Sequence, residues 1–136
     1  MVTKRGGSVR LLLDTHALLW WWTNDKQLSP TARNAMLDER NTVLVSAASV
    51  WEITTKYRLG KLPIADKAIK QFHTLVEADG FEHLPMTWQH SLLAGSYNSE
   101  HRDPFDRMLA AQSEIEKAQL VTCDAAFAGF GTAVLW

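Results

Sequence analysis

Four carboxylates stand where predicted strands end or predicted helices begin. They are Asp14, Glu52, Asp106 and Asp124. Asp14 directly follows the apolar run 9–13, and Asp124 follows the apolar run 119–123 in the same way. Ligands of open parallel sheets bind outside the carboxyl ends of the strands, so carboxylates placed there face the functional edge. A carboxylate held out of water destabilises a fold unless a partner compensates it, and the four are therefore predicted to converge on one cation site.

The chemistry of such a cluster follows from its charge. Crowded carboxylates raise one another's pKa, and a bound divalent cation removes the conflict. Oxygen ligands favour Mg²⁺, with Mn²⁺ as the alternative, over zinc, and the single cysteine, Cys123, excludes a cysteine zinc cluster. Ions of this kind activate water and stabilise a phosphate under attack. The predicted reaction is metal-assisted phosphodiester hydrolysis, in which a 3′-hydroxyl leaves and a 5′-phosphate remains.

Three of these acids, and the neighbouring Asp103, also have an ordinary structural interpretation. Asp14 would be the N-cap of the helix that follows it, and Glu52 would be a solvated helix glutamate. Asp103 and Asp106 would form a capping pair for a helix that begins at Pro104, because carboxylates are stabilised at the positive end of the helix dipole. Asp103 therefore competes with Asp106 for the third position in the cluster.

Basic side chains near these acids in the sequence are candidates for gripping a phosphate backbone. The substrate-binding candidates are Arg102, Arg107, Lys56, Arg58 and His16. Solvated charges at helix ends are the alternative for the arginines and the lysine, and a structural role is the alternative for the histidine.

Apolar periodicity and turn residues predict alternating strands and helices. The predicted strands cover residues 9–13, 42–45, 81–85, 119–123 and 132–136. The predicted helices cover residues 17–22, 30–39, 47–59, 64–78, 88–93 and 104–118, with a short helix or turn at 125–130. This alternation favours an α/β fold, a single domain whose parallel β-sheet is flanked by helices on both faces.

Two of these helices carry conspicuous aromatic side chains. Trp20, Trp21 and Trp22 cannot all face one core, because successive helix residues point ~100° apart. We expect at least one of them to be exposed or covered by another chain. In the helix over 47–59, one broad face holds Ala47, Val50, Trp51, Thr54 and Tyr57.

Length and charge set further limits. The 136 residues fit one domain with one hydrophobic core. Residues 1–8 are expected to form a flexible leader before a domain over 9–136. The net charge of −1 gives no global footprint for nucleic acid, although a local basic patch is sufficient. No stretch approaches the ~18 apolar residues of a membrane span, so we expect a soluble, cytoplasmic protein.

Four stretches together resemble a known family. They are Leu12–His16, Ser49–Ile53, His101–Gln112 and Thr122–Asp124. In order and spacing they resemble PIN-domain proteins, specifically VapC-like toxin ribonucleases of type II toxin–antitoxin systems, over nearly the whole chain after the leader. The resemblance implies a single PIN-like nuclease domain over 9–136 that acts as a Mg²⁺-dependent endoribonuclease.

The resemblance also implies roles and partners. The family's four acids, which hold metal and are catalytic, fall in order on Asp14, Glu52, Asp106 and Asp124, and the third is placed on Asp106 in preference to Asp103. The implied partners are an RNA substrate, a cognate antitoxin protein that occupies the active-site groove, and a second copy in a homodimer.

Three other classes compete with this interpretation. A phosphatase, or a nuclease of other substrates including DNA, would use the same cluster. A receiver-like signalling domain also gathers acids around Mg²⁺, but it needs a phosphoacceptor aspartate after a central strand and a lysine after a late one. Here Ser46 follows Val45 and Asp124 follows Cys123, so that match is poor. A catalytically inactive interaction module, in which the acids only cap helices, is the third.

Overall fold

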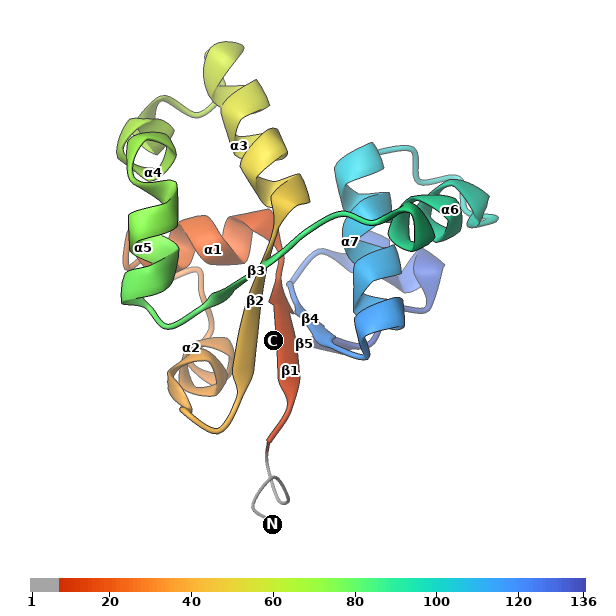
Figure 1. The fold of residues 1–136 in the computed structure, drawn as a ribbon, viewed down its shortest axis with the longest axis horizontal. Coiled ribbons are helices and arrows are strands. Elements are labelled where there is room, and N and C mark those ends of the chain that lie inside the picture. The colour runs from red at the N-terminus through yellow and green to blue at the C-terminus, as the bar shows by residue number, and fades with distance from the viewer. Residues whose placement is uncertain (1–7) are drawn as a thin grey trace.

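The computed structural model describes residues 8–136, so nearly all of the predicted leader over 1–8 lies outside the described residues. The elements in chain order are β1 (Arg10–Leu13), α1 (Thr15–Trp22), α2 (Pro30–Leu37), β2 (Thr42–Ser46), α3 (Ala47–Arg58), the 3₁₀ turn η1 (Pro63–Ala65), α4 (Asp66–Lys70), α5 (Phe72–Ala78), β3 (Glu82–Leu84), α6 (Trp88–Ser96), α7 (Pro104–Glu116), β4 (Gln119–Val121), η2 (Ala125–Phe130) and β5 (Val134–Leu135). Figure 1 shows the sheet between α1–α5 on one side and α6, α7 and η2 on the other. Within residues 8–136 no helix has both the length and the apolar character to cross a membrane.

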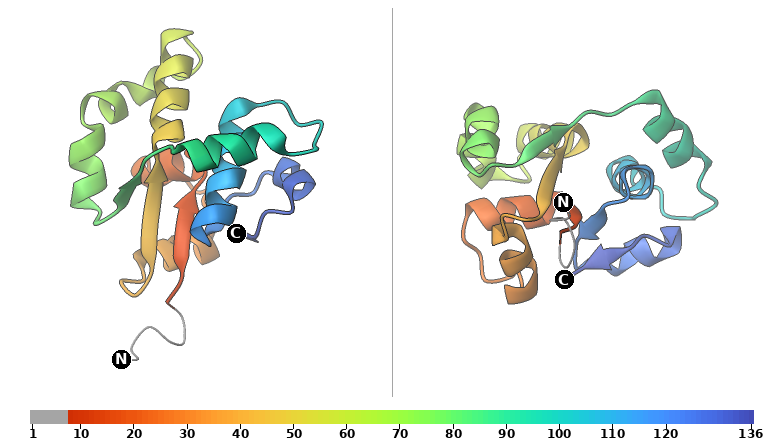
Figure 2. Two further views of the ribbon diagram at one scale, coloured as in Figure 1. Left: turned by 45° about the vertical axis from the view of Figure 1, so that its right-hand side comes forward. Right: turned by 60° about the horizontal axis from the view of Figure 1, so that its bottom comes forward.

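The five strands form one all-parallel sheet in the order β3-β2-β1-β4-β5, which confirms the predicted α/β architecture. β1 is central and pairs with β2 through Leu11 and Val43 and with β4 through Leu12 and Leu120. The chain fills one side of the sheet with β2 and β3 and then crosses to the other side for β4 and β5. Connections after β1 and β4 therefore run in opposite directions, and their carboxyl ends form the topological switch point where open α/β sheets bind ligands. Figure 2 shows this arrangement from two further sides.

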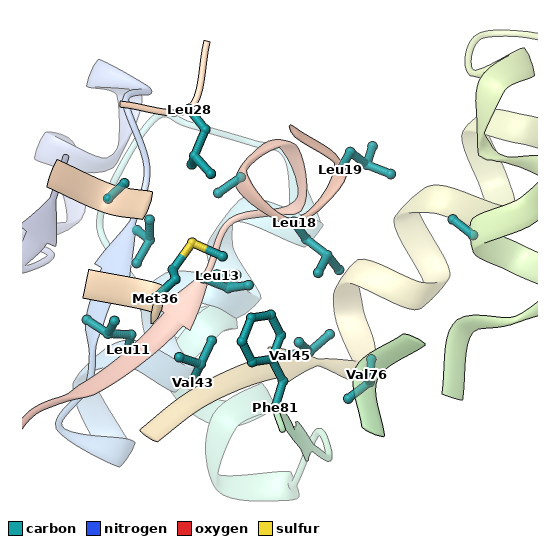
Figure 3. Close-up of a cluster of buried hydrophobic side chains, with 14 of the residues drawn as sticks. Leu11, Leu13, Leu18, Leu19, Leu28, Met36, Val43, Val45, Val76 and Phe81 are labelled. Carbon is teal, nitrogen blue, oxygen red and sulfur yellow. The ribbon is translucent and has the colours of Figure 1, made fainter. Parts of the chain in front are cut away.

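Alternate side chains of β1 enter two separate cores, as the two-residue period of a strand requires. Leu11 and Leu13 pack in the core formed with α1, α2, α3 and α5 (Figure 3), and Leu12 packs in the core formed with Leu109 and Phe127. All three β1 leucines are fully buried. Burial of one such side chain contributes roughly 1.5–3 kcal/mol, so the strand that leads into the first candidate acid is fixed on both faces.

The elements differ from the predicted ones mainly at their ends. The single helix predicted over 64–78 is instead η1, α4 and α5, because Gln71 leaves the helical region with a φ of −122°. α1 begins two residues early because Asp14 caps it, and α6 continues to Ser96. The last two strands are shorter than predicted.

The tryptophan triplet packs within its own chain. Trp20, Trp21 and Trp22 are each half-buried, and their rings lie 5.9, 5.7 and 5.2 Å from the rings of Trp136, Phe81 and Phe72. The indole nitrogens of Trp21 and Trp22 both donate to Asp79, at 3.1 and 2.9 Å. None of the three is exposed in the structure, because Trp136, Phe81 and Phe72 pack against them. The alternative, that another chain covers one of them, stays a prediction.

Candidate active site

Helices begin immediately where the strands end, so one sheet edge gathers several helix N-termini. Asp14 caps α1 by accepting from the His16 N–H at 3.1 Å, and Ser46 caps α3 by accepting from the Ala48 N–H at 2.9 Å. Asp124 caps η2. Four backbone N–H groups at each helix start lack intrahelical partners, which favours such side chains. Capping therefore explains part of the acid pattern.

Asp14 is held by a second bond that capping does not require. The buried Thr122 hydroxyl donates to its Oδ2 at 2.6 Å, from the residue after β4 to the residue after β1. The same hydroxyl accepts from the Asp124 N–H at 3.0 Å. One threonine thus ties the two strand ends of the switch point together.

Glu52 is buried, with only 4% of its surface exposed, although it lies in the second turn of a helix. The Thr15 hydroxyl donates to its Oε1 at 2.7 Å, and the Lys56 ammonium pairs with its Oε2. A hydroxyl carries one proton, so Thr15 accepts its 2.9 Å bond from Ser49. The solvated-glutamate interpretation is wrong, because α3 turns this carboxylate toward α1.

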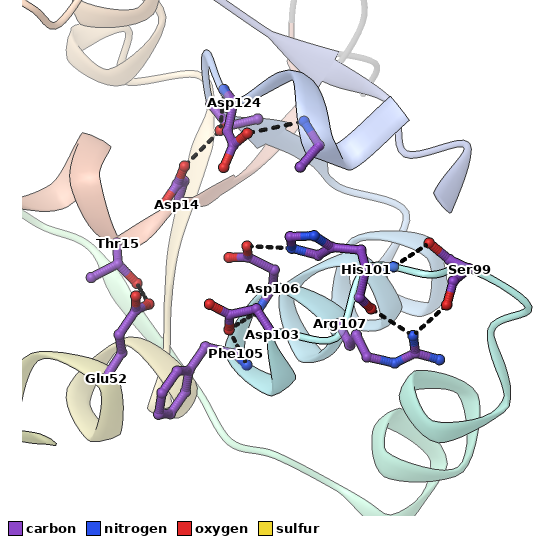
Figure 4. A network of polar contacts seen from close by, with 12 residues as sticks. Asp14, Thr15, Glu52, Ser99, His101, Asp103, Phe105, Asp106, Arg107 and Asp124 are labelled. Carbon is purple, nitrogen blue, oxygen red and sulfur yellow. Dashed lines mark hydrogen bonds and ion pairs between the residues drawn. The ribbon is translucent and has the colours of Figure 1, made fainter. Parts of the chain in front are cut away.

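Asp103 and Asp106 divide the two roles that the sequence left open. Asp103 Oδ1 accepts from the N–H groups of Phe105 and Asp106, at 2.9 and 3.2 Å, and is the N-cap of α7. Asp106 caps nothing; its Oδ2 lies 2.8 Å from His101 Nε2, and it points toward the gap between α7 and the Asp14 and Glu52 side chains (Figure 4).

Electrostatics link three of the acids. Burial raises the pKa of Asp14, and the charge of Glu52 adds to that effect. Burial raises the pKa of Asp106 to about 6, and the charges of Asp103, Asp14 and Glu52 contribute to the increase. Carboxylates that raise one another's pKa repel each other across a short, poorly solvated gap. Figure 4 shows the Asp14, Glu52 and Asp106 side chains around one gap at this edge of the sheet.

Asp124 lies at the rim of this cluster. It is exposed, and its Oδ1 accepts from the Ala126 N–H at 2.9 Å. Its connection to Asp14 runs through Thr122 and the backbone.

The cluster offers the oxygen donors that Mg²⁺ takes, but the donors are already engaged. Within the described residues, no three His, Cys, Asp or Glu side chains stand in the arrangement of a metal site. Lys56 neutralises Glu52, and His101 contacts Asp106. A divalent cation at this point would replace these two partners, which the chemistry of the donor set permits.

Comparison with known proteins identifies the family. The model of the PIN domain matches residues 11–132, which is most of the chain. The chain is a PIN-domain protein. A 31-residue segment is 61% identical to Ribonuclease VapC16 of Mycobacterium tuberculosis, and this match spans 23% of the chain and 22% of that relative.

Solved structures share the fold of this PIN domain. The structure of VapBC2 from Rickettsia felis, bound to a DNA fragment from its promoter, matches with a TM-score of 0.65 and 17% identity, over 94% of this chain and 98% of that one. FitAcB from Neisseria gonorrhoeae matches with a TM-score of 0.60 and 19% identity, over 93% and 96%. Both matches extend over nearly the whole of each chain, so this chain shares its fold with these two structures.

The basic candidates of the PIN domain differ in what they contact. Lys56 lies among the acids. Burial alone would lower the pKa of Lys56. The bond to Glu52 and the negative charges of Glu52, Asp103 and Asp106 outweigh burial, so the pKa is raised. His16 is exposed, with Nδ1 4.0 Å from Asp14 Oδ1.

Two arginines reach solvent. Arg102 is exposed beside the start of α7, and Arg58 is exposed in the last turn of α3, about 9 Å further along the helix axis than Glu52.

Arg107 is occupied by its own chain. Its guanidinium donates to the backbone carbonyls of Ala94, Tyr97, Ser99 and His101, at 2.6 to 3.2 Å. These bonds hold the loop between α6 and α7 in place. This loop positions His101 next to Asp106. We therefore replace the prediction that Arg107 binds substrate with a positioning role.

Arg107→Lys is expected to lower the free energy of unfolding by about 2 kcal/mol, because lysine cannot reproduce the fork of bonds to four carbonyls. Urea unfolding measures this change. The control is Arg102→Lys at an exposed position, expected within about 0.5 kcal/mol of wild type. Unchanged stability with weakened RNA binding in Arg107→Lys would restore the substrate-binding role.

Sequence reasoning missed the hydroxyl and amide groups that orient the acids. Thr15 directly follows Asp14, and Thr122 lies two residues before Asp124. Their closeness to these acids in the sequence is the signal that could have identified them. A second missed feature lies beneath α3: the Ser46 hydroxyl donates to buried Gln112 at 2.6 Å. Nothing in a single sequence signals this pair, because 66 residues separate its members.

Proposed function

We propose that this PIN domain is a Mg²⁺-dependent endoribonuclease and the toxin of a toxin–antitoxin pair. The observation that carries the proposal is the burial of Glu52 beside Asp14 and Asp106, three carboxylates that no capping role explains together. The local match to Ribonuclease VapC16 supports RNA as the substrate. A capping-only module would have no reason to bury Glu52 in mid-helix.

The acids of the cluster would bind the cation, and neighbouring hydroxyl groups would orient these acids. Asp14, Glu52 and Asp106 would hold the cation, with Asp124 at the rim. When bound, Mg²⁺ supplies the charge that activates water and stabilises a phosphate transition state. Thr122 and Thr15 fix the carboxylates of Asp14 and Glu52, so little reorganisation is needed.

The basic side chains within and around the cluster would bind phosphate. Lys56, released from Glu52, would remain beside the cation as a donor to a substrate phosphate. Arg102, Arg58 and His16 are exposed near the same edge or along α3 and would contact the RNA backbone.

The partners follow from the relatives. A toxin–antitoxin complex from Klebsiella pneumoniae shares the fold, with a TM-score of 0.52 and 13% identity over 92% of this chain and 96% of that one. We propose a cognate antitoxin that covers the acidic edge, together with a homodimer of the toxin. We expect the protein to meet RNA in the cytoplasm.

The test is cleavage of a panel of structured RNAs, with DNA for comparison, by protein purified without metal. We expect cutting of RNA in Mg²⁺, loss of cutting in EDTA, recovery on adding Mg²⁺ back, and fragments with 5′-phosphate ends. Asp106→Asn, purified in parallel, controls for contaminating nuclease. Equal cutting by both proteins, or an unfolding temperature that neither Mg²⁺ nor Mn²⁺ alters, would favour the metal-free interaction module.

A further inference from the structure

Helix α3 reverses the usual pattern of burial beside the acid cluster. Glu52 is buried, whereas the neighbouring Trp51 has 56% of its surface exposed. Tryptophan is usually highly buried and glutamate usually solvated, so folding alone does not account for this pair. The broad face predicted to hold Trp51 and Tyr57 is in fact a face on which both are exposed.

Trp51 forms one wall of an apolar pocket bordered by α3, α6 and α7. Its ring meets the Phe105 ring edge to face, with centroids 5.0 Å apart and planes at 84°. The pocket has a volume of about 200 Å³, and Ala48, Met86 and Met108 also line it. A pocket of this size, with an aromatic face on one side, fits one planar group.

The pocket and the acid cluster share the same two helices. Trp51 directly precedes Glu52 on α3, and Phe105 directly precedes Asp106 on α7. Figure 4 shows Phe105 on the α3 side of α7, next to Asp103 and below the acids. A chain whose phosphate reached the acids would therefore place its neighbouring group at the pocket.

The residues that line the pocket favour an uncharged ligand group over a phosphate. Arg107 is the one charged residue among the lining residues, and its guanidinium is taken by backbone carbonyls. A phosphate would find no free cation in the pocket, whereas a nucleobase has an apolar, polarisable face that stacks on aromatic side chains.

We infer that Trp51, supported by Phe105, stacks the nucleobase that lies next to the scissile phosphate. This inference rests on the proposed function and adds a recognition subsite to it. The base must be splayed out of its stack to enter the pocket.

The test measures binding of a short single-stranded oligoribonucleotide in Ca²⁺, an oxygen-liganded stand-in for Mg²⁺, by fluorescence anisotropy. A set of oligoribonucleotides carries one abasic position each. We expect one position at which loss of the base weakens binding to wild type by roughly tenfold. Trp51→Ala should bind the intact RNA roughly tenfold more weakly and lose that position's effect, and Trp51→Phe should retain most of both.

Trp88→Ala is the matched control, because Trp88 is more exposed, at 72%, and does not line the pocket. If Trp51→Ala binds like wild type and keeps the abasic effect while wild type still cuts RNA, the base subsite is overturned and the proposed function stands. If Trp51→Ala changes only the oligomeric state in sedimentation, the face is a protein interface and the inference is overturned. If wild type neither binds nor cuts RNA, both proposals fail.

Discussion

Replacing Asp106 with asparagine is expected to lower kcat/KM for RNA cleavage by about 10²–10³-fold. Asparagine preserves shape and still accepts from His101, so the loss reports the missing negative charge. Asp103→Asn is expected to lower kcat/KM by less than about tenfold, since asparagine is as good an N-cap as aspartate and the Asp103 contacts described above are capping bonds. Steady-state kinetics on one RNA substrate compares the two variants.

The pair of variants decides between two carboxylates three residues apart. Both substitutions remove one charge from the N-terminal end of α7, so a general electrostatic effect on RNA binding would act on both alike. Equal losses would therefore show that charge near α7, and not the position of Asp106, matters. A large loss in Asp103→Asn alone would assign the third acid to Asp103.

The sequence was informative where local chemistry determines structure. An apolar run ending in Asp14 predicted the central strand and its functional end, because a buried run must stop where polar groups begin. Asp103 caps the helix that begins at Pro104, as its structural interpretation predicts. The parallel sheet followed from the alternation of elements.

The remaining features depend on contacts between distant segments. Glu52 is buried only because Thr15 and Lys56 compensate it, and helical periodicity would place it outside. Arg107 lies beside two acids in the sequence but turns to the loop that precedes it. Residue order also could not show that Asp124 lies at the rim, exposed, and reaches Asp14 only through Thr122.

Without metal, the Asp106→Asn variant is expected to become more stable than wild type as pH rises from about 4 to 7. The pKa of Asp106 is about 6 in the folded protein, against about 3.9 in an unfolded chain. Below pH 4 the carboxyl is protonated in both states and contributes no difference. Between pH 4 and 6 the carboxyl group loses its proton in the unfolded chain before it does so in the folded protein, which favours unfolding of wild type. Above pH 6 the difference in stability between wild type and Asp106→Asn is constant.

At pH 7 we expect Asp106→Asn to exceed wild type by about 1–2 kcal/mol, after allowing for solvent screening at this partly exposed carboxylate. Urea unfolding of both proteins at several pH values measures the difference, in which the contributions of other titrating groups largely cancel. A difference that is independent of pH would mean that Asp106 ionises as an ordinary surface carboxylate. The repulsion among the acids would then be absent.

Mg²⁺ should reverse this order of stability. A cation that binds only the folded state stabilises wild type by about 2.7 kcal/mol at one hundred times its Kd, because it replaces repulsion among Asp14, Glu52 and Asp106 with attraction. Asp106→Asn lacks one of these ligands and should gain much less at the same concentration. The same carboxylates that weaken the metal-free fold would thus strengthen the loaded one. Equal stabilisation of both proteins by Mg²⁺ would place the cation elsewhere and remove Asp106 from its ligands.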